Sequence, residues 1–184
     1  MKQYLFLFLF ICIPFLHSCE DPALEQEYGE ALIYMPQATH NLGTDNNLSI
    51  TLVPSSDPDT TITLGIYRSG LQKLQKVTVD LVINTDTLAK AQAIAQQPDA
   101  PAKYDIYKTG VILPSGYYDP LPSTLTILDG DREATTSLVL KKEMILTDFT
   151  VGDILLLPVQ IKNPTLYELN TACSLTMVVI IVGP

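Results

Sequence analysis

The sequence predicts an all-β fold, a two-sheet antiparallel β-sandwich with one short helical insert. Three observations support this prediction: apolar and polar residues alternate along many short segments, turn-forming residues separate the segments, and a single stretch has the composition of a helix. Successive side chains of a strand point to opposite faces, so the alternation indicates strands with one buried face. Many short strands divided by polar turns are typical of a sandwich.

The expected strands begin with Leu32 and Tyr34. Each later strand is marked by apolar residues two positions apart: Leu48, Ile50 and Leu52; Ile62, Leu64 and Ile66; Val77, Val79, Leu81 and Ile83; Leu125 and Ile127; Leu138 and Leu140; Leu155, Leu157, Val159 and Ile161. The stretches SSDPD, RSG, DGD, TVGD and KNP favour tight reversals. Pro158 lies inside one strand, and because proline cannot donate a ladder hydrogen bond, we expect an edge position or a bulge there.

The helical stretch runs from Asp86 to Gln97. It is rich in alanine and long side chains, Asp86 is a plausible N-cap, and the stretch stops before Pro98. Its apolar stripe of Leu88, Ala91 and Ala95 is narrow, which places the helix on an edge of the sandwich.

The last expected strand, Leu175 to Val182, is apolar on both faces. A strand with one solvent-exposed face would alternate. We therefore expect this strand to be covered on both sides or to lie against a partner.

The N-terminus predicts a lipoprotein signal peptide at residues 1–18, an acidic flexible tether at 19–29 and a single β-sandwich domain at 30–184. Lys2 precedes an apolar run from Tyr4 to Leu16, a secretory pattern that is shorter than the about 20 residues of a spanning helix. Leu16 and Ser18 stand at positions −3 and −1 of a lipobox whose Cys19 would carry the acyl chains. The alternative is an ordinary secretion signal followed by an incidental cysteine.

Composition excludes some partners and chemistries. The net charge of −9 disfavours nucleic acid, because binding to phosphates requires an excess of Lys and Arg. Cys12 would leave with the signal peptide and Cys19 would be acylated, so Cys173 lacks a disulfide partner and is expected to be a small buried residue.

The sequence predicts no enzyme, no cofactor and no metal. His40, in a polar loop, is the single histidine after the predicted signal peptide, and no Gly-rich phosphate loop or zinc-ligand spacing is present. Asp129, Asp131 and Glu133 have the spacing of a calcium loop, but the positions that need glycine and a bidentate glutamate hold other residues. A hairpin turn is the better interpretation.

A ligand site is predicted at Tyr117, Tyr118 and Asp119 in the turn-rich SGYYDP stretch. Sugar rings dock their C–H faces on exposed aromatic rings, and the chain has no tryptophan. Neighbouring residues of an extended segment point in opposite directions, so at least one tyrosine is expected to pack inward. The alternative is that both tyrosines close the end of the sandwich. Tyr104 and Tyr107 are a second, weaker choice.

Three segments carry a family resemblance: LGIYRSG (64–70), ILPSGYYDPLPSTLTILDGD (112–131) and LLLPVQIKN (155–163). With the lipobox and the acidic tether before them, they resemble the conserved blocks of the Bacteroidetes lipoprotein domain of unknown function 1735. The resemblance implies an immunoglobulin-like sandwich on surface lipoproteins of glycan utilisation, often followed by a second module that binds or cleaves carbohydrate. Acids after Cys19 resemble the signal for export to the outer face of the outer membrane; a periplasm-facing lipoprotein is the alternative.

Together these features predict a non-catalytic outer-membrane surface lipoprotein, an accessory module in polysaccharide capture. Its expected partners are the membrane, through the lipid anchor, and a polysaccharide or other envelope proteins. The alternative is a protein interaction or assembly module, including a fimbrial-type subunit, that acts through an edge strand such as Leu175 to Val182.

Overall fold

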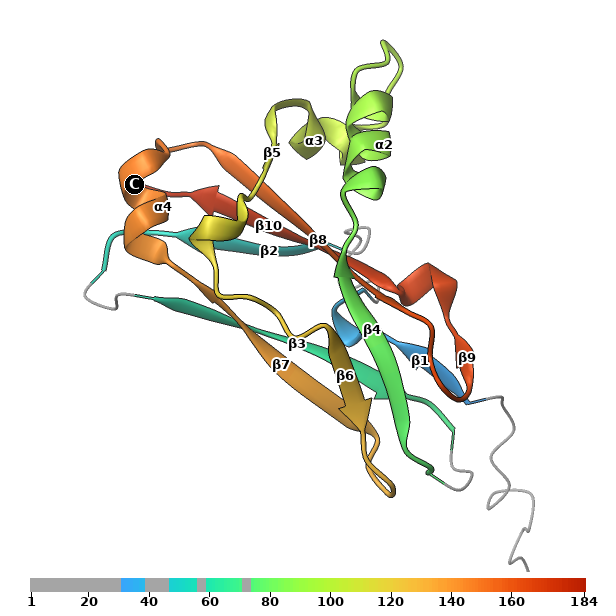
Figure 1. Ribbon diagram of the computed structural model, residues 1–184. Coiled ribbons are helices and arrows are strands. Elements are labelled where there is room, and N and C mark those ends of the chain that lie inside the picture. Colours follow the sequence, from blue (N-terminus) through green and yellow to red (C-terminus); the bar gives the residue numbers. More distant parts are fainter. Residues whose placement is uncertain (1–30, 39–46, 56–58, 71–73) are drawn as a thin grey trace, which may run out of the picture.

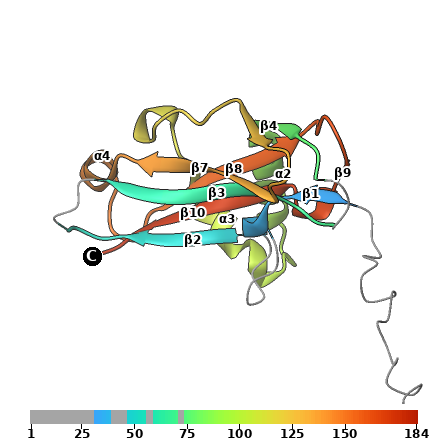
Figure 2. The ribbon, with the colours of Figure 1, turned by 90° about the horizontal axis from the view of Figure 1, so that it is seen from below.

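The computed structural model describes residues 31–38, 47–55, 59–70 and 74–184. Within these ranges the chain forms two β-sheets that pack face to face in an elongated body, with a helical segment outside one sheet and a short helix at one end (Figures 1 and 2). The predicted signal peptide, the tether, Cys19 and His40 lie outside the described residues.

One sheet has four strands, in the spatial order β7 (Glu133–Leu140), β3 (Thr60–Arg68), β1 (Leu32–Tyr34), β9 (Glu168–Leu169). The other has the order β2 (Asn47–Leu52), β10 (Leu175–Val182), β8 (Ile154–Lys162), β4 (Val77–Ile83), β6 (Thr124–Ile127), and β5 (Val111–Ile112) also pairs with β8. The α-helices of the described residues are α2 (Thr85–Ala95), α3 (Asp105–Thr109) and α4 (Lys142–Asp148). Short 3₁₀ turns are η2 (Pro36–Ala38), η3 (Ala102–Tyr104), η4 (Ser115–Tyr117) and η5 (Thr171–Cys173).

The apolar rows read from the sequence form the main core between the sheets. Ile62, Leu64 and Ile66 of β3 are buried, as are Val77 and Val79 of β4. The threonines of β3, and Thr78 and Asp80 of β4, are exposed or half-buried. The period-two prediction is confirmed here because burial on one face of a strand is what the alternation records.

The expectation of a purely antiparallel arrangement is wrong for part of the fold. β10 pairs with β2 in parallel, β1 with β9 in parallel, and β5 with β8 in parallel. The other strand pairs of the described residues are antiparallel. Alternation fixes which face of a strand is buried and carries no information on the direction of its neighbour.

β10 is covered on both faces, which is one of the two outcomes expected for this apolar run. Val178 and Ile180 point into the main core, while Met177 and Val179 belong to a second apolar cluster on the outer face of the sheet. β10 also lies between β2 and β8. The suggestion that this run is an available edge strand is therefore wrong.

The expected single helical insert is wrong in number, because the described residues contain three α-helices. The stretch predicted from Asp86 forms one of them, α2, but its cap and its location differ from the prediction. The side chain of Asn84, rather than of Asp86, accepts a 3.2 Å hydrogen bond from the Thr87 amide. Leu88 and Ala95 are buried in the second apolar cluster. The helix thus covers the outer face of the six-stranded sheet instead of an edge (Figure 1).

Pro158 lies in the middle of a central strand, so the expected edge position is wrong. β8 pairs with β10 on one side, and on the other side with β5 through Leu156 and with β4 from Val159 onward. The Pro158 carbonyl accepts a 2.9 Å hydrogen bond from Asn84, just past the end of β4. The nitrogen of Pro158 faces the same side, so the reciprocal bond to the Asn84 carbonyl is missing, at the point where the pairing with β4 ends.

Two further observations concern the surroundings of the core. Cys173 in η5 is a free thiol and is half-buried against the main core, so it is less enclosed than expected. Among the described residues, no helix combines the length and the apolar character that crossing a membrane requires.

Candidate functional site

The predicted site residues Tyr117, Tyr118 and Asp119 lie along the outer edge of β7. Tyr118 forms an antiparallel bridge with Leu140. The Tyr117 carbonyl accepts from the Lys141 amide at 2.9 Å, and the Asp119 amide donates to the Val139 carbonyl at 2.9 Å. The backbone of this segment thus pairs with the C-terminal end of β7, at the edge of the four-stranded sheet.

The side chains of Tyr117 and Tyr118 differ in burial and in their contacts. Tyr117 is half-buried; its hydroxyl donates a 2.8 Å hydrogen bond to Asp148 Oδ2, and its ring meets Phe149 edge-on with centroids 5.3 Å apart. Tyr118 is 8% exposed and belongs to the main core. As expected, at least one of the pair packs inward, so the two rings do not form a shared platform.

The tyrosine environments also affect proton binding. The hydrogen bond to Asp148 raises the pKa of Tyr117 above its ordinary value of 10.0, with smaller contributions from desolvation and from the Asp148 charge. Burial raises the pKa of Tyr118. Both phenols are therefore neutral at physiological pH.

A shallow hollow of about 260 Å³ lies beside Tyr118. Its lining residues come from β4 and from the segment around η4, and they are Leu81, Val82, Ile83, Ser115, Tyr118, Pro120 and Leu121. Most of these side chains are apolar, and Asp119 does not line the hollow. Ser115 and Tyr118 are the lining residues that carry a polar side-chain group.

A second hollow, of about 230 Å³, lies between the α2–α3 segment and the six-stranded sheet. We call it the α2–α3 pocket, and its lining residues are Asn47, Thr87, Ala91, Lys103, Tyr104, Tyr107, Leu175 and Met177. These residues come from β2, α2, η3, α3 and β10. The fold thus joins one apolar surface and several polar side chains that are distant in the sequence.

Two tyrosines form the aromatic side of the α2–α3 pocket. The rings of Tyr104 and Tyr107 are 5.9 Å apart and tilted by 48°. The Tyr107 hydroxyl donates a 3.2 Å hydrogen bond to Asn47 Oδ1. The Lys103 ammonium lies 5.4 Å from the centre of the Tyr104 ring, a distance at which a cation is attracted to an aromatic face.

Part of this pocket could be predicted from the sequence. Tyr104 and Tyr107 are the second, weaker candidate pair, whereas the sequence does not single out Asn47, Thr87 or Lys103. Lys103 adjoins Tyr104 in the sequence and was the available signal. Asn47 and Thr87 are brought in by strand pairing and helix packing, which a local pattern does not report.

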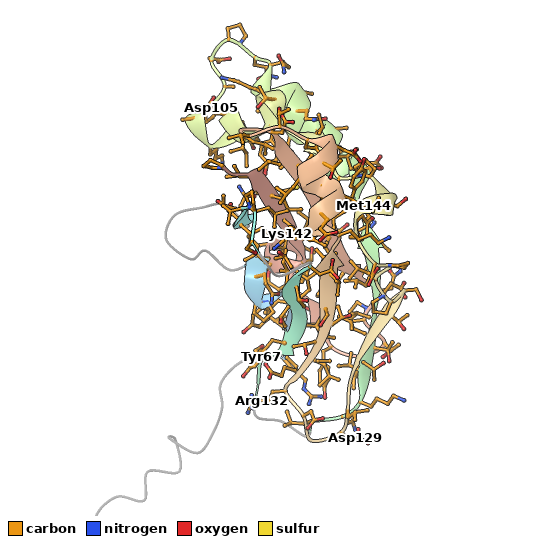
Figure 3. The ribbon with its side chains drawn as sticks, turned by 90° about the vertical axis from the view of Figure 1, so that its left-hand side faces the viewer. Tyr67, Asp105, Asp129, Arg132, Lys142 and Met144 are labelled. Carbon is orange, nitrogen blue, oxygen red and sulfur yellow. The ribbon has the colours of Figure 1, made fainter. Side chains whose placement is uncertain are left out.

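A charged cluster at the opposite end of the molecule is structural. Figure 3 shows Tyr67, Arg132 and Asp129 at one end and Asp105 of α3 at the other. Here the Arg68 guanidinium is fully buried, donates to the carbonyls of Gln75 and Asp131, and lies 5.4 Å from the ring centre of Tyr167. It ties two loops to the end of β3.

The Asp129, Asp131 and Glu133 stretch is a turn between the two sheets. It links β6 of one sheet to β7 of the other, so the expected hairpin is wrong. Asp129 Oδ1 accepts from the Lys76 amide, and the Asp131 carbonyl accepts from Arg68. In the part of the chain that the structure describes, no three His, Cys, Asp or Glu residues are grouped closely enough to hold a metal ion.

Comparison with known proteins identifies similar domains. A family model for an N-terminal domain matches residues 26–168. Comparison with curated proteins gives no match.

Several solved structures from Bacteroides share the fold. A candidate carbohydrate-binding protein of Bacteroides ovatus has a TM-score of 0.56 at 10% identity, with 83% of this chain and 37% of that chain covered. A multidomain protein of Bacteroides ovatus that includes the domain of unknown function 1735 has a TM-score of 0.54 at 14% identity, with 83% and 45% covered. A two-domain protein of unknown function from Bacteroides fragilis has a TM-score of 0.51 at 12% identity, with 90% and 51% covered. The chain therefore spans about half or less of the length of these proteins, none of which is named as an enzyme.

Proposed function

We propose that this chain, which belongs to the N-terminal domain family whose model matches residues 26–168 and shares its fold with a Bacteroides protein that includes the domain of unknown function 1735, is a non-catalytic accessory module in polysaccharide capture. The observation that carries this proposal is the α2–α3 pocket, where two tyrosine rings stand beside amide, hydroxyl and ammonium groups. Such a mixture of apolar surface and few polar groups suits a carbohydrate, whose ring has both C–H faces and hydroxyls.

The similarity in fold to a candidate carbohydrate-binding protein of Bacteroides supports the same class of function. We further propose that the sandwich is immunoglobulin-like in topology, as the family resemblance implies. The sequence-predicted site at Tyr117, Tyr118 and Asp119 stays a prediction, and fewer polar side chains line its hollow than line the α2–α3 pocket.

Affinity electrophoresis tests the binding proposal. The full chain is run through native gels that contain single plant or host polysaccharides, beside a non-binding protein of similar charge. We expect retardation by at least one polysaccharide, since binding slows migration. Unchanged mobility across a broad panel would contradict direct glycan binding.

We also propose that Cys19 is acylated and anchors the protein at the outer membrane, facing the cell surface. The lipobox ending at Cys19 and the acids that follow it motivate this proposal. Two acyl chains anchor a protein stably, because each buried methylene contributes about 0.8 kcal/mol. Replacing Cys19 with Ala should move the product out of the membrane fraction, and protease treatment of intact cells should degrade the wild-type protein. An unchanged fractionation of Cys19→Ala would refute the anchor, and protection from protease would refute the outward orientation.

A second candidate function is assembly with another protein through β2. This strand, Asn47–Leu52, is at one edge of the six-stranded sheet and pairs there with β10, and Val53 directly after it is 44% exposed. An unpaired edge can accept a strand from another chain. Crosslinking in cells should then capture an envelope partner through a cysteine placed at Val53. A monomer that captures no partner would exclude this function.

A further inference from the structure

We propose that the α2–α3 pocket binds a single acidic sugar residue, a uronic acid, and holds it with Tyr104 and Lys103. The inference rests on the proposed function and adds the location of the glycan subsite and the chemical class of its sugar. Three properties of the pocket lead to it: size, the arrangement of its apolar and aromatic surface, and the sign of its charge.

The size of the pocket limits the ligand. A volume of about 230 Å³ falls below the about 300–1,000 Å³ of sites for drug-sized ligands. It accommodates one ring of a sugar chain rather than several. The rest of a polysaccharide would then extend into solvent.

The apolar surface of the pocket suits a sugar ring that lies on its C–H face. Ala91, Leu175 and Met177 contribute apolar surface, and Tyr104 is half-buried at its side. Tyr107 is 8% exposed, and its hydrogen bond to Asn47 fixes the ring. Because the two rings are tilted by 48°, a flat ligand can stack on only one of them, and Tyr104 is the more exposed.

A hydrogen bond and apolar packing hold the walls of the pocket in place. The Gln92 side chain of α2 donates a 2.8 Å hydrogen bond to the Gly110 carbonyl at the end of α3. Leu88 and Tyr107 pack together with Leu156 of β8 in the second apolar cluster. A site whose walls are fixed before binding loses less conformational entropy when the ligand arrives.

The charge of the pocket selects the class of sugar. Among the described residues that line the pocket, Lys103 is the one that carries a charge, in a chain whose net charge is −9. Its ammonium lies beside the ring on which the sugar would stack. A carboxylate on that sugar would therefore meet a cation at the place of stacking, and hydrogen bonds between ionised groups are the stronger ones.

Methyl NMR of the full chain tests the inference directly. The chain has four methionines; Met177 lines the pocket, Met35 lies in the main core, and Met144 is exposed on α4. The protein is labelled with ¹³C-methyl methionine, and a Met177→Leu variant assigns the Met177 signal. Galacturonic acid and its uncharged methyl ester are then titrated into the protein in separate experiments. We expect the Met177 signal to shift with the acid while the Met35 and Met144 signals stay in place.

Variants with matched controls test the roles of Tyr104 and Lys103 in binding. Tyr104→Ala and Lys103→Gln should each weaken galacturonic acid binding at least tenfold, and Lys103→Gln should leave binding of the methyl ester unchanged. The control for the aromatic change is Tyr34→Ala, because Tyr34 pairs with Tyr67 at 5.4 Å on the other sheet. The control for the charge is Lys108→Gln, because Lys108 is on the same segment and pairs with Asp105 at 2.6 Å. Both controls should bind as the wild type does.

The possible results separate this inference from the proposed function. If polysaccharides retard the protein but galacturonic acid leaves Met177 unmoved, or Tyr104→Ala binds normally, the inference is overturned and glycan capture stands. If the methyl ester binds as tightly as the acid, the role of Lys103 is overturned. If no polysaccharide is bound at all, the proposed function itself fails.

Discussion

Tyr117 donates its hydroxyl proton to Asp148 in a 2.8 Å hydrogen bond, which joins the turn before Tyr118 to the end of α4. The same bond holds the Tyr117 proton more tightly in the folded chain than in the unfolded one, because it raises the pKa of the phenol above 10.0. The bond therefore links alkaline pH to the attachment of α4.

The first prediction concerns pH. A folded-state pKa above the unfolded value means that the stabilisation is fully present below about pH 10 and is lost as the pH rises through the folded-state pKa. Tyr117→Phe should lower stability at pH 7 and flatten the fall in the free energy of unfolding above pH 10, measured by urea denaturation. Asp148→Asn should also flatten the fall in the free energy of unfolding above pH 10, since it removes the charged acceptor. A fall as steep as that of the wild type in both variants would contradict this account.

The second prediction concerns the attachment of α3 to the sheet. A Cβ atom at Gly110 would lie 2.5 Å from Leu156 Cδ1 and 2.6 Å from the Ile106 carbonyl oxygen. Gly110→Ala should therefore lower the free energy of unfolding by about 1–3 kcal/mol, the usual cost of overpacking. The control is Gly116→Ala, where nothing lies within 4 Å of the added atom. Thermal denaturation that ranks the two variants equally would argue against the close packing of α3 on β8.

The third prediction concerns the buried Arg68. Its guanidinium reaches two carbonyls, of Gln75 and Asp131, on separate loops. A lysine has a single ammonium and cannot span both in the same way. Arg68→Lys should lower the free energy of unfolding by about 1.5–3 kcal/mol, on the scale of one lost hydrogen bond to a charged group. Chemical denaturation provides the measurement.

Arg132 is the matched control for this change. It is half-buried and donates through one nitrogen to the Gly70 carbonyl at 2.9 Å. Arg132→Lys can retain a single bond of this kind and should have a small effect. Equal losses in both variants would show that the two-loop bridge has no special role.

The strand faces of this fold could be predicted from the sequence, but the strand partners could not. The rows of Ile62 and Leu64 or of Val77 and Val79 are buried as the alternation required. The parallel pairing of β10 with β2 and the central position of Pro158 depend on neighbours that are distant in the chain. Neither strand contains a signal that identifies its partner.

Helix α2 illustrates the same limit. The sequence shows a helix with a narrow apolar stripe, and separately a strand that is apolar on both faces. These two features belong together, because Leu88 and Ala95 pack in one cluster with Met177 and Val179. Tyr107 of α3 belongs to the same cluster and adds to the apolar surface of α2. Nothing in either segment reports that contribution.

The candidate site was partly predictable for a related reason. Tyr117 and Tyr118 are candidates from the sequence because they are aromatic residues in a turn-rich stretch, and the structure explains their pattern by edge pairing and packing. The α2–α3 pocket needs Asn47, which the fold brings to Tyr107 from another part of the chain. A site assembled from several elements is recognisable only after the elements are placed.

The fourth prediction joins stability to the pocket. Leu88 is 3% exposed and is the largest apolar contact of α2 in the second apolar cluster. Leu88→Ala should cost about 2–5 kcal/mol, because it removes buried methylenes and leaves a cavity. Ile94→Ala, at a half-buried position of the same helix, should cost less. Because Leu88 supports the helix that carries Thr87 and Ala91, its loss should also shift the Met177 methyl signal while the Met35 signal in the main core stays in place. An equal shift of both methionines would mean that the outer layer and the main core are not separate packing units.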